Sequence, residues 1–294
     1  MIPIKSANDI EAMRQGGKIL AQILAELKVK TVPGIKRSEL ESLAKRLCLK
    51  YHAKASFLGY KGYPNALCVS LNNEVVHGIP NESKICSGDL VSLDMGIFYA
   101  GFHTDAAISF VCPSANVYSE QSRRTQDKLS QGQSQRGQTL KKSQGLSSKG
   151  TVEQSQQGQS LQETAERLIK TAENAFFSAC DLVRDGVRLG DISAKIQEVS
   201  EHDGFGVIRM LVGHGIGREV HEEPPVPNYG TAGTGPILKT GMTLAIEPMI
   251  TEGGYDVILS DDKWTYVTRD NSRAAHFEHT VLVTDQGFEI LTQL

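Results

Sequence analysis

Two aspartates, Asp94 and Asp105, stand in one apolar stretch, 91–110, that reads as two β-strands joined by a tight turn. If Tyr99 and Ala100 form that turn, Asp94 lies directly opposite Asp105. Carboxylates in opposed positions have Cβ atoms about 5 Å apart and repel each other. Either one of them takes a proton or a cation sits between them. A solvated hairpin tip would be the simpler interpretation, but the apolar flanks argue against exposure.

Two glutamates interrupt apolar runs further along the chain. Glu247 lies in the run 243–249 and Glu278 in the run 276–283, and both runs resemble β-strands. A glutamate at a strand end that faces water would be the simpler interpretation, because burial without a partner is costly. Together with the two aspartates, these glutamates favour a buried cation.

A glycine-rich segment, 213–225, carries His214 and His221 and ends near a pair of prolines. Glycines beside a histidine allow the backbone to approach a ligand closely, and the prolines stiffen the exit. A lone histidine is more often structural than a ligand, but two in such a segment favour a site. No Gly-x-Gly-x-x-Gly pattern leads from a strand into a helix here, so a dinucleotide site is not indicated.

Four carboxylates and one imidazole suit two hard or borderline divalent ions such as Mn, Fe or Co, whereas a structural zinc site would contain more sulfur and nitrogen. Two ions bridged by carboxylates lie about 3.5–4 Å apart and share a water whose pKa they lower. The predicted chemistry is hydrolysis of an acyl bond, and no Gly-x-Ser-x-Gly motif competes with it. The predicted ligands are Asp94, Asp105, His214, Glu247 and Glu278.

The elements that must position these residues begin with two helices. A Ser6–Asp9 capping box opens the first helix, and a second helix is predicted from Ser38, with Glu41 three residues on, toward Tyr51. A Pro-Gly break separates the two helices. The apolar face of the first helix follows gaps of three and four: Ile10, Met13, Leu20, Leu24 and Leu27, with Gly17 at the missing step.

The same plan returns later in the chain. A helix is predicted over about 163–184 and another over about 191–202, again with a glycine break between them. The breaks 34–40 and 186–192 share one pattern: Gly, aliphatic, basic, two variable positions, acidic, aliphatic. Strand-like sequence follows each helix pair. We therefore predict an α+β fold with duplicated halves, although helix–Gly–helix punctuation is common enough for coincidence.

The predicted halves, 1–112 and 163–294, form a single domain (1–294) with a polar insert, 113–162, between them. The insert holds 12 Gln and 10 Ser and no Phe, Trp or Ile, so we expect it to be largely disordered. Its seven basic and three acidic residues give a charge of +4, which leaves −7 for the rest of a chain of net charge −3. A solvated loop is the simpler interpretation, and a basic tether for RNA on the ribosome is the alternative.

Composition limits the compartment. The chain is 39% hydrophobic and 22% charged, as in soluble globular proteins. Its five cysteines form no Cys-x-x-Cys pair, which disfavours a disulfide framework and favours a reducing compartment. No segment resembles a signal peptide or a membrane span, so we expect a cytoplasmic, non-membrane protein.

The order of these motifs resembles the type I methionine aminopeptidases. The resemblance covers the chain outside 113–162 and rests on the following segments: the aspartate pair, Gly-His-Gly-Ile-Gly at 213–217, Ile-Glu-Pro at 246–248, Glu-His-Thr at 278–280, and the stretches 59–64 and 74–80. It implies the pita-bread fold, with two pseudo-symmetric halves around a central antiparallel sheet. The implied activity of a monomeric, bacterial-type enzyme is removal of the initiator methionine from nascent proteins whose second residue is small.

The resemblance also implies roles for the ligands. Asp94 would chelate one of two divalent metal ions (Co, Mn, Fe or Zn), and His214 with Glu247 would bind the other. Asp105 and Glu278 would bridge both ions. A bridging water would attack the scissile carbonyl, with Glu247 as the proton acceptor.

Further residues correspond to the substrate site of that family. His77 would hydrogen-bond the scissile peptide or its tetrahedral intermediate, and His221 would contact the substrate carbonyl oxygen. The pocket residues resemble a methionine-binding wall and its outer rim: Tyr63, Cys68 and Trp264 for the wall and Tyr60 for the rim. Cys68 and Trp264 could equally be ordinary core residues. Three other histidines are candidates for hydrogen-bond partners of the ligands: His103, His276 and His279.

Two departures and two alternatives accompany the resemblance. Val220 replaces a frequent Phe, and Phe57 stands where some relatives carry Cys; both bear on the pocket's shape. A Xaa-Pro aminopeptidase or prolidase would share the fold but usually carries an extra N-terminal domain, for which the room before Asp94 is short. A non-catalytic relative that binds RNA or ribosomes should have lost metal ligands, whereas all five are present.

Overall fold

The computed structural model describes residues 2–114 and 149–294, with the backbone alone over 149–159. Its helices are α1 (Ala7–Lys30), α2 (Arg37–Lys50), α4 (Lys149–Cys180), α5 (Leu189–His202) and the short 3-10 helix η1 (Tyr60–Gly62). Its strands are β1 (Lys54–Ala55), β2 (Cys68–Leu71), β3 (Glu74–Val76), β4 (Leu90–Tyr99), β5 (Phe102–Val111), β6 (Gly206–Val207), β7 (Gly213–Gly215), β8 (Glu222–Val226), β9 (Thr243–Ile246), β10 (Met249–Thr251), β11 (Val257–Leu259), β12 (Tyr266–Thr268), β13 (Ala274–His276), β14 (Glu278–Val283) and β15 (Phe288–Ile290).

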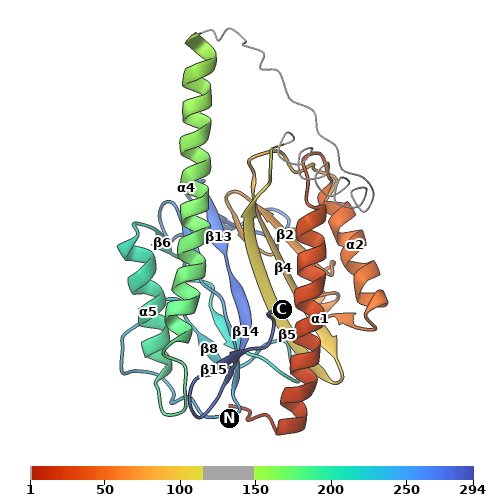
Figure 1. Ribbon diagram of the computed structural model, residues 1–294, viewed down its shortest axis with the longest axis vertical. Helices are drawn as coiled ribbons and strands as arrows, with labels where there is room; N and C mark the ends of the chain where they lie inside the picture. The colour runs from red at the N-terminus through yellow and green to blue at the C-terminus, as the bar shows by residue number, and fades with distance from the viewer. Residues whose placement is uncertain (1, 115–148) are drawn as a thin grey trace, which may run out of the picture.

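A nine-stranded antiparallel sheet forms the centre of the molecule. Its order is β1-β4-β5-β14-β9-β7-β8, with β2 also paired to β4 and β15 to β14. Two three-stranded sheets, β13-β10-β6 and β11-β12-β3, complete the strand structure. Helices α1 and α4 lie across the sheet, with α2 and α5 on their outer sides (Figure 1). This arrangement confirms the predicted α+β fold of two pseudo-symmetric halves.

The glycine breaks of the two halves make matching backbone hydrogen bonds. The N–H of Gly34 donates to the carbonyl of Ile85 at 2.8 Å, and the N–H of Gly186 donates to the carbonyl of Leu238 at 3.0 Å. Both glycines have a left-handed φ, +92° and +87°, which other residues adopt only at a cost. The shared sequence pattern therefore encodes a shared turn.

The acidic residue of each break caps the helix that follows. The carboxylate of Glu39 accepts from the N–H of Lys36 at 2.9 Å, and that of Asp191 accepts from the N–H of Arg188 at 3.2 Å. Each acid lies in the first turn of its helix, where the helix dipole favours negative charge. The second helix of each half thus starts in the same way.

The predicted start of α2 at Ser38 is wrong by one residue, because the helix begins at Arg37. Glu41 does not cap this helix, as its spacing from Ser38 suggested. It is buried, and its carboxylate accepts from the backbone N–H of Ala66 at 2.9 Å and of Leu67 at 3.0 Å. Helix α2 therefore fixes the segment that leads into β2.

Helix α1 follows its prediction closely. The Ser6–Asp9 capping box is present, with bonds of 3.0 and 3.3 Å between the two residues. Gly17 lies on the buried face, where a Cβ would stand 2.0 Å from the carbonyl oxygen of Leu291. The missing step in the apolar pattern is therefore the point at which the C-terminal segment crosses the helix.

Helix α4 is longer than predicted at its N-terminal end. It begins at Lys149, so residues 149–162 of the expected insert are helical, and it ends at Cys180. Residues 115–148 lie outside the described part of the chain, and disorder there stays a prediction. Helix α5 begins at Leu189, two residues earlier than predicted.

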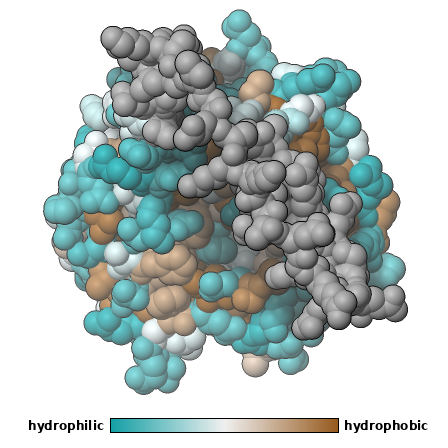
Figure 2. All heavy atoms as spheres, turned by 45° about the horizontal axis from the view of Figure 1, so that its top comes forward, coloured by the Kyte–Doolittle hydropathy of each residue, from teal (hydrophilic) through white to brown (hydrophobic). Residues whose placement is uncertain are grey.

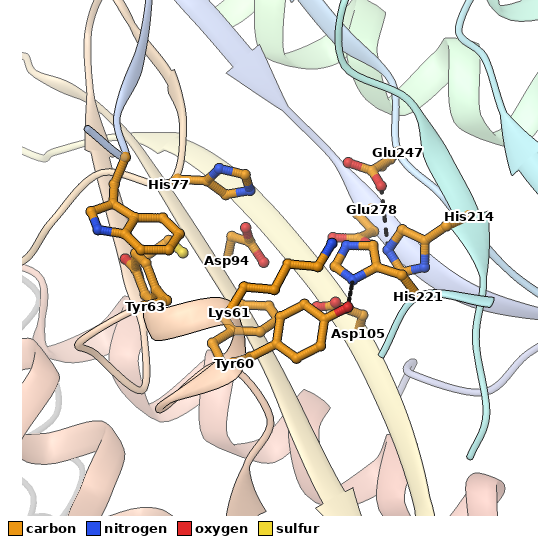
Figure 3. Close-up of a pocket in the computed structure, with 13 residues that line it drawn as sticks. Tyr60, Lys61, Tyr63, His77, Asp94, Asp105, His214, His221, Glu247 and Glu278 are labelled. Carbon is orange, nitrogen blue, oxygen red and sulfur yellow. Dashed lines mark hydrogen bonds and ion pairs between the residues drawn. The ribbon is translucent and has the colours of Figure 1, made fainter. Parts of the chain in front are cut away.

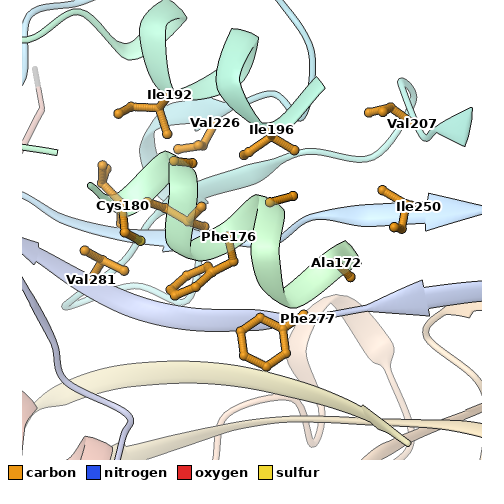
Figure 4. Close-up of a cluster of buried hydrophobic side chains, with 14 of the residues drawn as sticks. Ala172, Phe176, Cys180, Ile192, Ile196, Val207, Val226, Ile250, Phe277 and Val281 are labelled. Carbon is orange, nitrogen blue, oxygen red and sulfur yellow. The ribbon is translucent and has the colours of Figure 1, made fainter. Parts of the chain in front are cut away.

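Each half has its own hydrophobic core between its helices and the sheet. In the second half, Phe176 of α4 packs edge-on against Phe277 with ring centroids 5.3 Å apart (Figure 4). In the first half, Leu20 of α1 and Leu40 of α2 belong to the cluster that also contains Leu93 of β4. The cores hold the strands that carry the site in fixed positions.

The molecular surface in Figure 2 is mostly hydrophilic, with small hydrophobic areas scattered over it, as on most globular proteins. Over the described residues, no helix combines the length and the apolar character that crossing a bilayer requires.

Candidate metal centre and substrate cavity

The two aspartates come from the β4–β5 hairpin, whose register differs from the prediction. Ala100 and Gly101 form the turn, both with positive φ (+49° and +93°), as the two-residue type I′ turn requires. Asp105 therefore pairs with Gly96 and Asp94 with Ala107. The prediction that the aspartates are directly opposite is wrong, but a shift of two residues leaves both on the same face.

Strand pairing places residues from neighbouring strands on the same face of the sheet as the two aspartates. Cys68 of β2 pairs with Asp94, Asp94 with Ala107, and Ala107 with Glu278 of β14. Ala107 leaves space between the flanking carboxylates because its side chain is a single methyl group. Asp105, two residues from Ala107 on the same strand, points to the same side. Three predicted ligands therefore meet because of strand register alone.

The other two ligands come from the second half. His214 lies in β7, and its Nδ1–H donates to the carbonyl of Gly215 at 2.9 Å. Its Nε2 is then without a proton and lies 3.6 Å from Oε1 of Glu247, which follows β9. A neutral imidazole oriented in this way presents a lone pair to a metal.

These residues line one cavity of about 180 Å³ (Figure 3). Its lining contains every predicted ligand and every predicted substrate-binding residue: Tyr60, Tyr63, Cys68, His77, Asp94, Asp105, His214, His221, Glu247, Trp264 and Glu278. Two more residues complete it, Phe57 and Lys61. The sequence predictions therefore converge on a single concave site.

Burial opposes ionisation of all four acids. It raises the pKa of Asp105 to about 7. It also raises the pKa of Asp94 well above its usual range, and the neighbouring Asp105 adds to this rise. The pKa values of Glu247 and Glu278 are raised for the same two reasons, burial first and then repulsion between the acids. Four carboxylates could ionise here together only if a cation joined them.

The donor set fits divalent metal ions. One oxygen each of Asp94 and Asp105 is buried without a hydrogen-bond partner. Donor atoms of Asp105, His214 and Glu278 all lie within 4.8 Å of one another. No lysine or arginine among the described residues forms an ion pair with the four acids. Oxygen-rich sites with one imidazole suit hard and borderline divalent cations.

His276 lies between two of the ligands. Its Nε2 is 3.5 Å from Oε2 of Glu247 and 3.7 Å from Oε2 of Glu278, and the ring is buried without a hydrogen bond. Ser109 holds its backbone from β5, since the Ser109 hydroxyl accepts from the N–H of His276 at 3.0 Å. Burial lowers the pKa of His276 to about 3, so the ring is neutral.

The other two candidate histidines point elsewhere. His279 neighbours Glu278 in the same strand and therefore faces the helices, where it bonds Thr292 at 2.8 Å. His103 bonds the hydroxyl of Ser56 at 2.8 Å and does not line the cavity. The expectation that these two contact the ligands is wrong.

His221 stands where the cavity opens. It is exposed, and its Nδ1 forms a 2.9 Å hydrogen bond with the hydroxyl of Tyr60 (Figure 3). Its ring is 4.2 Å from that of His214. The pKa of His221 is lowered by the burial of part of its ring and by the neighbouring His214 and Lys61, which favours the neutral ring.

His77 reaches the cavity from the turn after β3. Its φ is +58°, a conformation that costs energy for a residue other than glycine and occurs often at functional sites. Its ring lies near that of Tyr266, with centroids 6.0 Å apart. The backbone geometry turns the imidazole toward the acids in Figure 3.

The opposite end of the cavity is apolar. Tyr63 and Trp264 meet edge-on with ring centroids 5.3 Å apart, and Cys68 lies beside them in the lining. Tyr63 and Cys68 are buried. Burial, with nearby Asp94 reinforcing it, raises the pKa of Cys68 well above its usual value, so this thiol is neutral. This end can receive an unbranched apolar side chain.

Comparison with known proteins identifies the class of protein to which this site belongs. Residues 11–142 and 154–285 match Metallopeptidase family M24, and the chain belongs to this family. Full-length relatives narrow the class further. The methionine aminopeptidase of Clostridium perfringens is 40% identical over 99% of both chains, and methionine aminopeptidase 1 of Bacillus subtilis is 35% identical over the whole of both. The resemblance predicted from the motifs is confirmed.

Solved structures agree. A methionine aminopeptidase from Thermotoga maritima superimposes with a TM-score of 0.82 at 40% identity and full coverage of both chains. A prolidase from Pyrococcus furiosus gives a TM-score of 0.67 at 18% identity, and this chain covers 65% of it. The prolidase likeness shows a shared pita-bread fold alone. The alternative of a Xaa-Pro peptidase therefore gains no support beyond the fold.

Lys61 had no predicted role, although it lies in the stretch 59–64 that resembles the methionine aminopeptidases. The glycines that surround it, at 59 and 62, were the available signal, because paired glycines mark a turn that can direct a side chain inward. Phe57 was noted only as a departure. In the structure it packs so closely on Gly96 that a Cβ there would stand 2.9 Å from its ring.

Proposed function

We propose that this metallopeptidase removes the N-terminal methionine from polypeptides whose second residue is small, through a centre of two divalent ions held by the five predicted ligands. One observation carries the proposal: three buried acids, the partly buried Glu247 and an unprotonated imidazole nitrogen converge in a cavity that has an apolar aromatic end. Full-length relatives that are methionine aminopeptidases support the same reaction.

The ligand roles divide between the two halves. Asp94 from the first half would hold one ion, His214 and Glu247 from the second half would hold the other, and Asp105 and Glu278 would bridge them. Ions bound there, with Co, Mn, Fe and Zn all compatible with the donors, would polarise the scissile carbonyl and activate water.

Three residues would handle protons and hydrogen bonds. Glu247 is the candidate acceptor for the proton of the attacking water, since its carboxylate faces the cavity. His77 would donate to the scissile peptide or to the oxyanion that develops from it. His221 is neutral, and if its Nδ1 accepts from Tyr60, its Nε2–H is left to donate to the substrate carbonyl oxygen.

The pocket explains the choice of methionine. A flexible, unbranched thioether would fit between the rings of Tyr63 and Trp264, with Cys68 at its end. A β-branched or charged side chain would lose contacts or bury charge there, and one misplaced methylene is worth about 10–200-fold in such pockets.

Peptide turnover tests the proposal. The protein, stripped with a chelator and reloaded with Mn or Co, should release methionine from Met-Ala-Ser and leave Ala-Pro peptides intact. Restored cleavage should need the added metal. Cleavage of the Ala-Pro peptide in preference to Met-Ala-Ser would establish the prolidase alternative, and failure to cleave either after reloading would favour a non-catalytic relative.

The setting of the reaction is also a proposal. All five cysteines are free, which suits a reducing compartment such as the cytoplasm, where new chains are made. The +4 charge of residues 113–162 suits a contact with ribosomal RNA. Deleting 115–148 should then weaken co-sedimentation with ribosomes at low salt, whereas unchanged binding would leave a solvated loop as the interpretation.

A further inference from the structure

Lys61 lies where the cavity opens and has an unusual backbone. It lines the cavity, it is exposed, and its φ of +48° is left-handed. The turn around it is held by hydrogen bonds from the N–H of Gly62 to the carbonyl of Gly59 at 3.1 Å and from Tyr63 to Tyr60 at 2.9 Å. Left-handed backbone at a lysine costs energy and gathers at functional sites. Its consequence here is a side chain that runs along the cavity instead of out into solvent (Figure 3).

The ammonium of Lys61 acts on one end of the cavity. Its nitrogen lies 5.3 Å from the centroid of the Tyr60 ring, whose hydroxyl forms a 2.9 Å hydrogen bond with Nδ1 of His221. Figure 3 shows the Lys61 nitrogen directed toward His221. Asp94, by contrast, acts on Tyr63 and Cys68 at the apolar end. The apolar end is therefore distinct from the end that Lys61 and His221 line, while three of the acids lie beside His214.

The difference between the two ends of the cavity determines the direction in which a polypeptide substrate can bind. The methionine side chain would occupy the apolar end, and Lys61 would repel the substrate's N-terminal ammonium, so the ammonium would lie away from Lys61. The rest of the polypeptide must leave past Lys61, Tyr60 and His221. Each residue after the methionine adds about 3.3–3.6 Å of extended chain, which brings the third residue to the outer part of the cavity.

The charge of Lys61 has no counterpart nearby. Among the described residues it forms no ion pair, and its one charge-related contact is with the ring of Tyr60, 5.3 Å from its nitrogen. The four acids would be neutralised by the two divalent ions of the proposed function, which leaves Lys61 as the one charged side chain of the lining without compensation. An ammonium in this position attracts carboxylates and repels ammonium groups.

We infer that Lys61 is a specificity-determining residue that contacts the substrate beyond the scissile bond and favours an acidic side chain at the third position. The inference rests on the proposed function, because it assumes that a polypeptide is cleaved after its first residue. It predicts a ranking of substrates by charge, independent of the methionine and of the small second residue.

Matched peptides test the inference. Met-Ala-Asp, Met-Ala-Asn and Met-Ala-Lys peptides, otherwise identical, differ only in charge at the third position. At low ionic strength the wild-type kcat/KM should follow Asp, then Asn, then Lys, with about 1.5- to fivefold for each step, the range of exposed ion pairs. Lys61→Gln should remove the ranking and Lys61→Glu should invert it. Salt near 1 M should also flatten the wild-type ranking.

Lys263 provides a matched control. It is an exposed lysine with a left-handed φ of +67° in the turn before Trp264, and it does not line the cavity. Lys263→Gln should keep the wild-type ranking. Thermal unfolding of all variants checks that the backbone is intact, and Lys61→Gly, which relieves the left-handed strain, should lose the ranking while remaining folded.

The outcomes separate the two proposals. If the wild type fails to cleave the neutral Asn peptide, the proposed function is wrong. If it cleaves all three peptides but Lys61→Gln keeps the wild-type ranking, the inference about Lys61 is wrong. An equal loss on all three peptides in Lys61→Gln would also overturn it, because Lys61 would then serve the shared backbone and not the third side chain.

Discussion

The structure contains two kinds of buried acid, which differ in whether the protein itself compensates their charge. Glu41 accepts hydrogen bonds from two backbone N–H groups of residues 66 and 67 and pairs with Lys45 at 2.8 Å. Asp94 and Asp105, equally buried, each leave an oxygen without a partner. The protein supplies its own donors for the first acid and leaves the others to an external cation.

The difference in hydrogen bonding distinguishes a structural acid from a metal ligand. Burial alone does not separate them, because Glu41 is as inaccessible as Asp94. Hydrogen-bond saturation does, since a carboxylate surrounded by N–H donors gains little from a metal, whereas an unsaturated group of acids is unfavourable until a metal arrives. Four experiments test whether the two kinds of acid differ in this way.

The largest effect is expected from Asp105→Asn. Loss of a bridging carboxylate should lower methionine release by more than about a hundredfold, because even changes to hydrogen-bond partners of ligands cost 10–100-fold. Peptide turnover and metal content of the purified variant measure it. Near-normal turnover with full metal content would remove Asp105 from the ligand set.

The metal-free protein should lose stability as pH rises above about 6.5. Asp105, whose folded pKa is raised to about 7, contributes a fall in stability only from about pH 4 to about pH 7, its unfolded and folded pKa values. The fall continues at higher pH through Asp94, Glu247 and Glu278, whose pKa values are raised well above their usual range, so that the folded state keeps protons that the unfolded chain has lost. Between about pH 4 and 6.5 the buried His214 opposes this fall. Its folded pKa is lowered to about 4, so in this range the unfolded chain binds a proton that the folded protein lacks, and this contribution to stability rises with pH.

Urea unfolding between pH 6.5 and 8.5, with and without Mn, measures this prediction. Each acid that still holds its proton contributes a slope of about 1.4 kcal/mol per pH unit. Metal at about 100 times its Kd should add roughly 2.7 kcal/mol and remove the decline. A metal-free protein whose stability is flat over this range would show that the acids are ionised without a cation.

Replacement of His276 should have an intermediate effect. Its ring contacts Glu247 and Glu278, so His276→Ala should weaken metal binding by about tenfold or more. Calorimetric metal titration and the visible spectrum of the cobalt-loaded protein measure the change, and His276→Gln, which keeps an N–H donor, should restore part of it. His279→Gln is the control, because His279 faces the helices; equal losses in both variants would contradict a specific role.

The smallest effect on metal binding is expected from Glu41→Gln. The amide keeps one acceptor oxygen but loses the charge, so stability should fall by about 1–3 kcal/mol. The metal affinity should stay unchanged, because Glu41 contacts no ligand. A parallel fall in metal affinity and stability would mean that the two groups of acids are coupled.

Much of the site was predictable because its information is local. The five ligands lie in short motifs, and the repeated glycine breaks predicted the duplicated halves. The hairpin register was predicted wrongly although its signal is local, since Tyr99-Ala100 and Ala100-Gly101 both offer a two-residue turn but only the second contains a glycine. The choice depends on which residues accept positive φ, and glycine at 101 accepts it at less cost than tyrosine at 99.

Contacts between distant elements were also beyond the sequence. The spacing from Ser38 to Glu41 suggested a helix cap, but the partners of Glu41 are residues 66 and 67, which no local pattern connects to it. The position of His276 between two glutamates depends on the pairing of β13 with β10. Such positions depend on how distant helices and strands pack together, which local secondary-structure propensity and hydrophobic periodicity do not reveal.

The seam between the halves has a consequence for how the molecule is held together. Strands β5 and β14 pair there at Ala107–Glu278 and Ala106–His279, strands β3 and β12 also pair across the halves, and the metal donors come from both sides. The bound ions would then add a cross-link between two halves that already share hydrophobic clusters around Val76 and Met13. Two fragments, cut within 115–148 and produced apart, should reassemble into an active heterodimer more readily when metal is supplied.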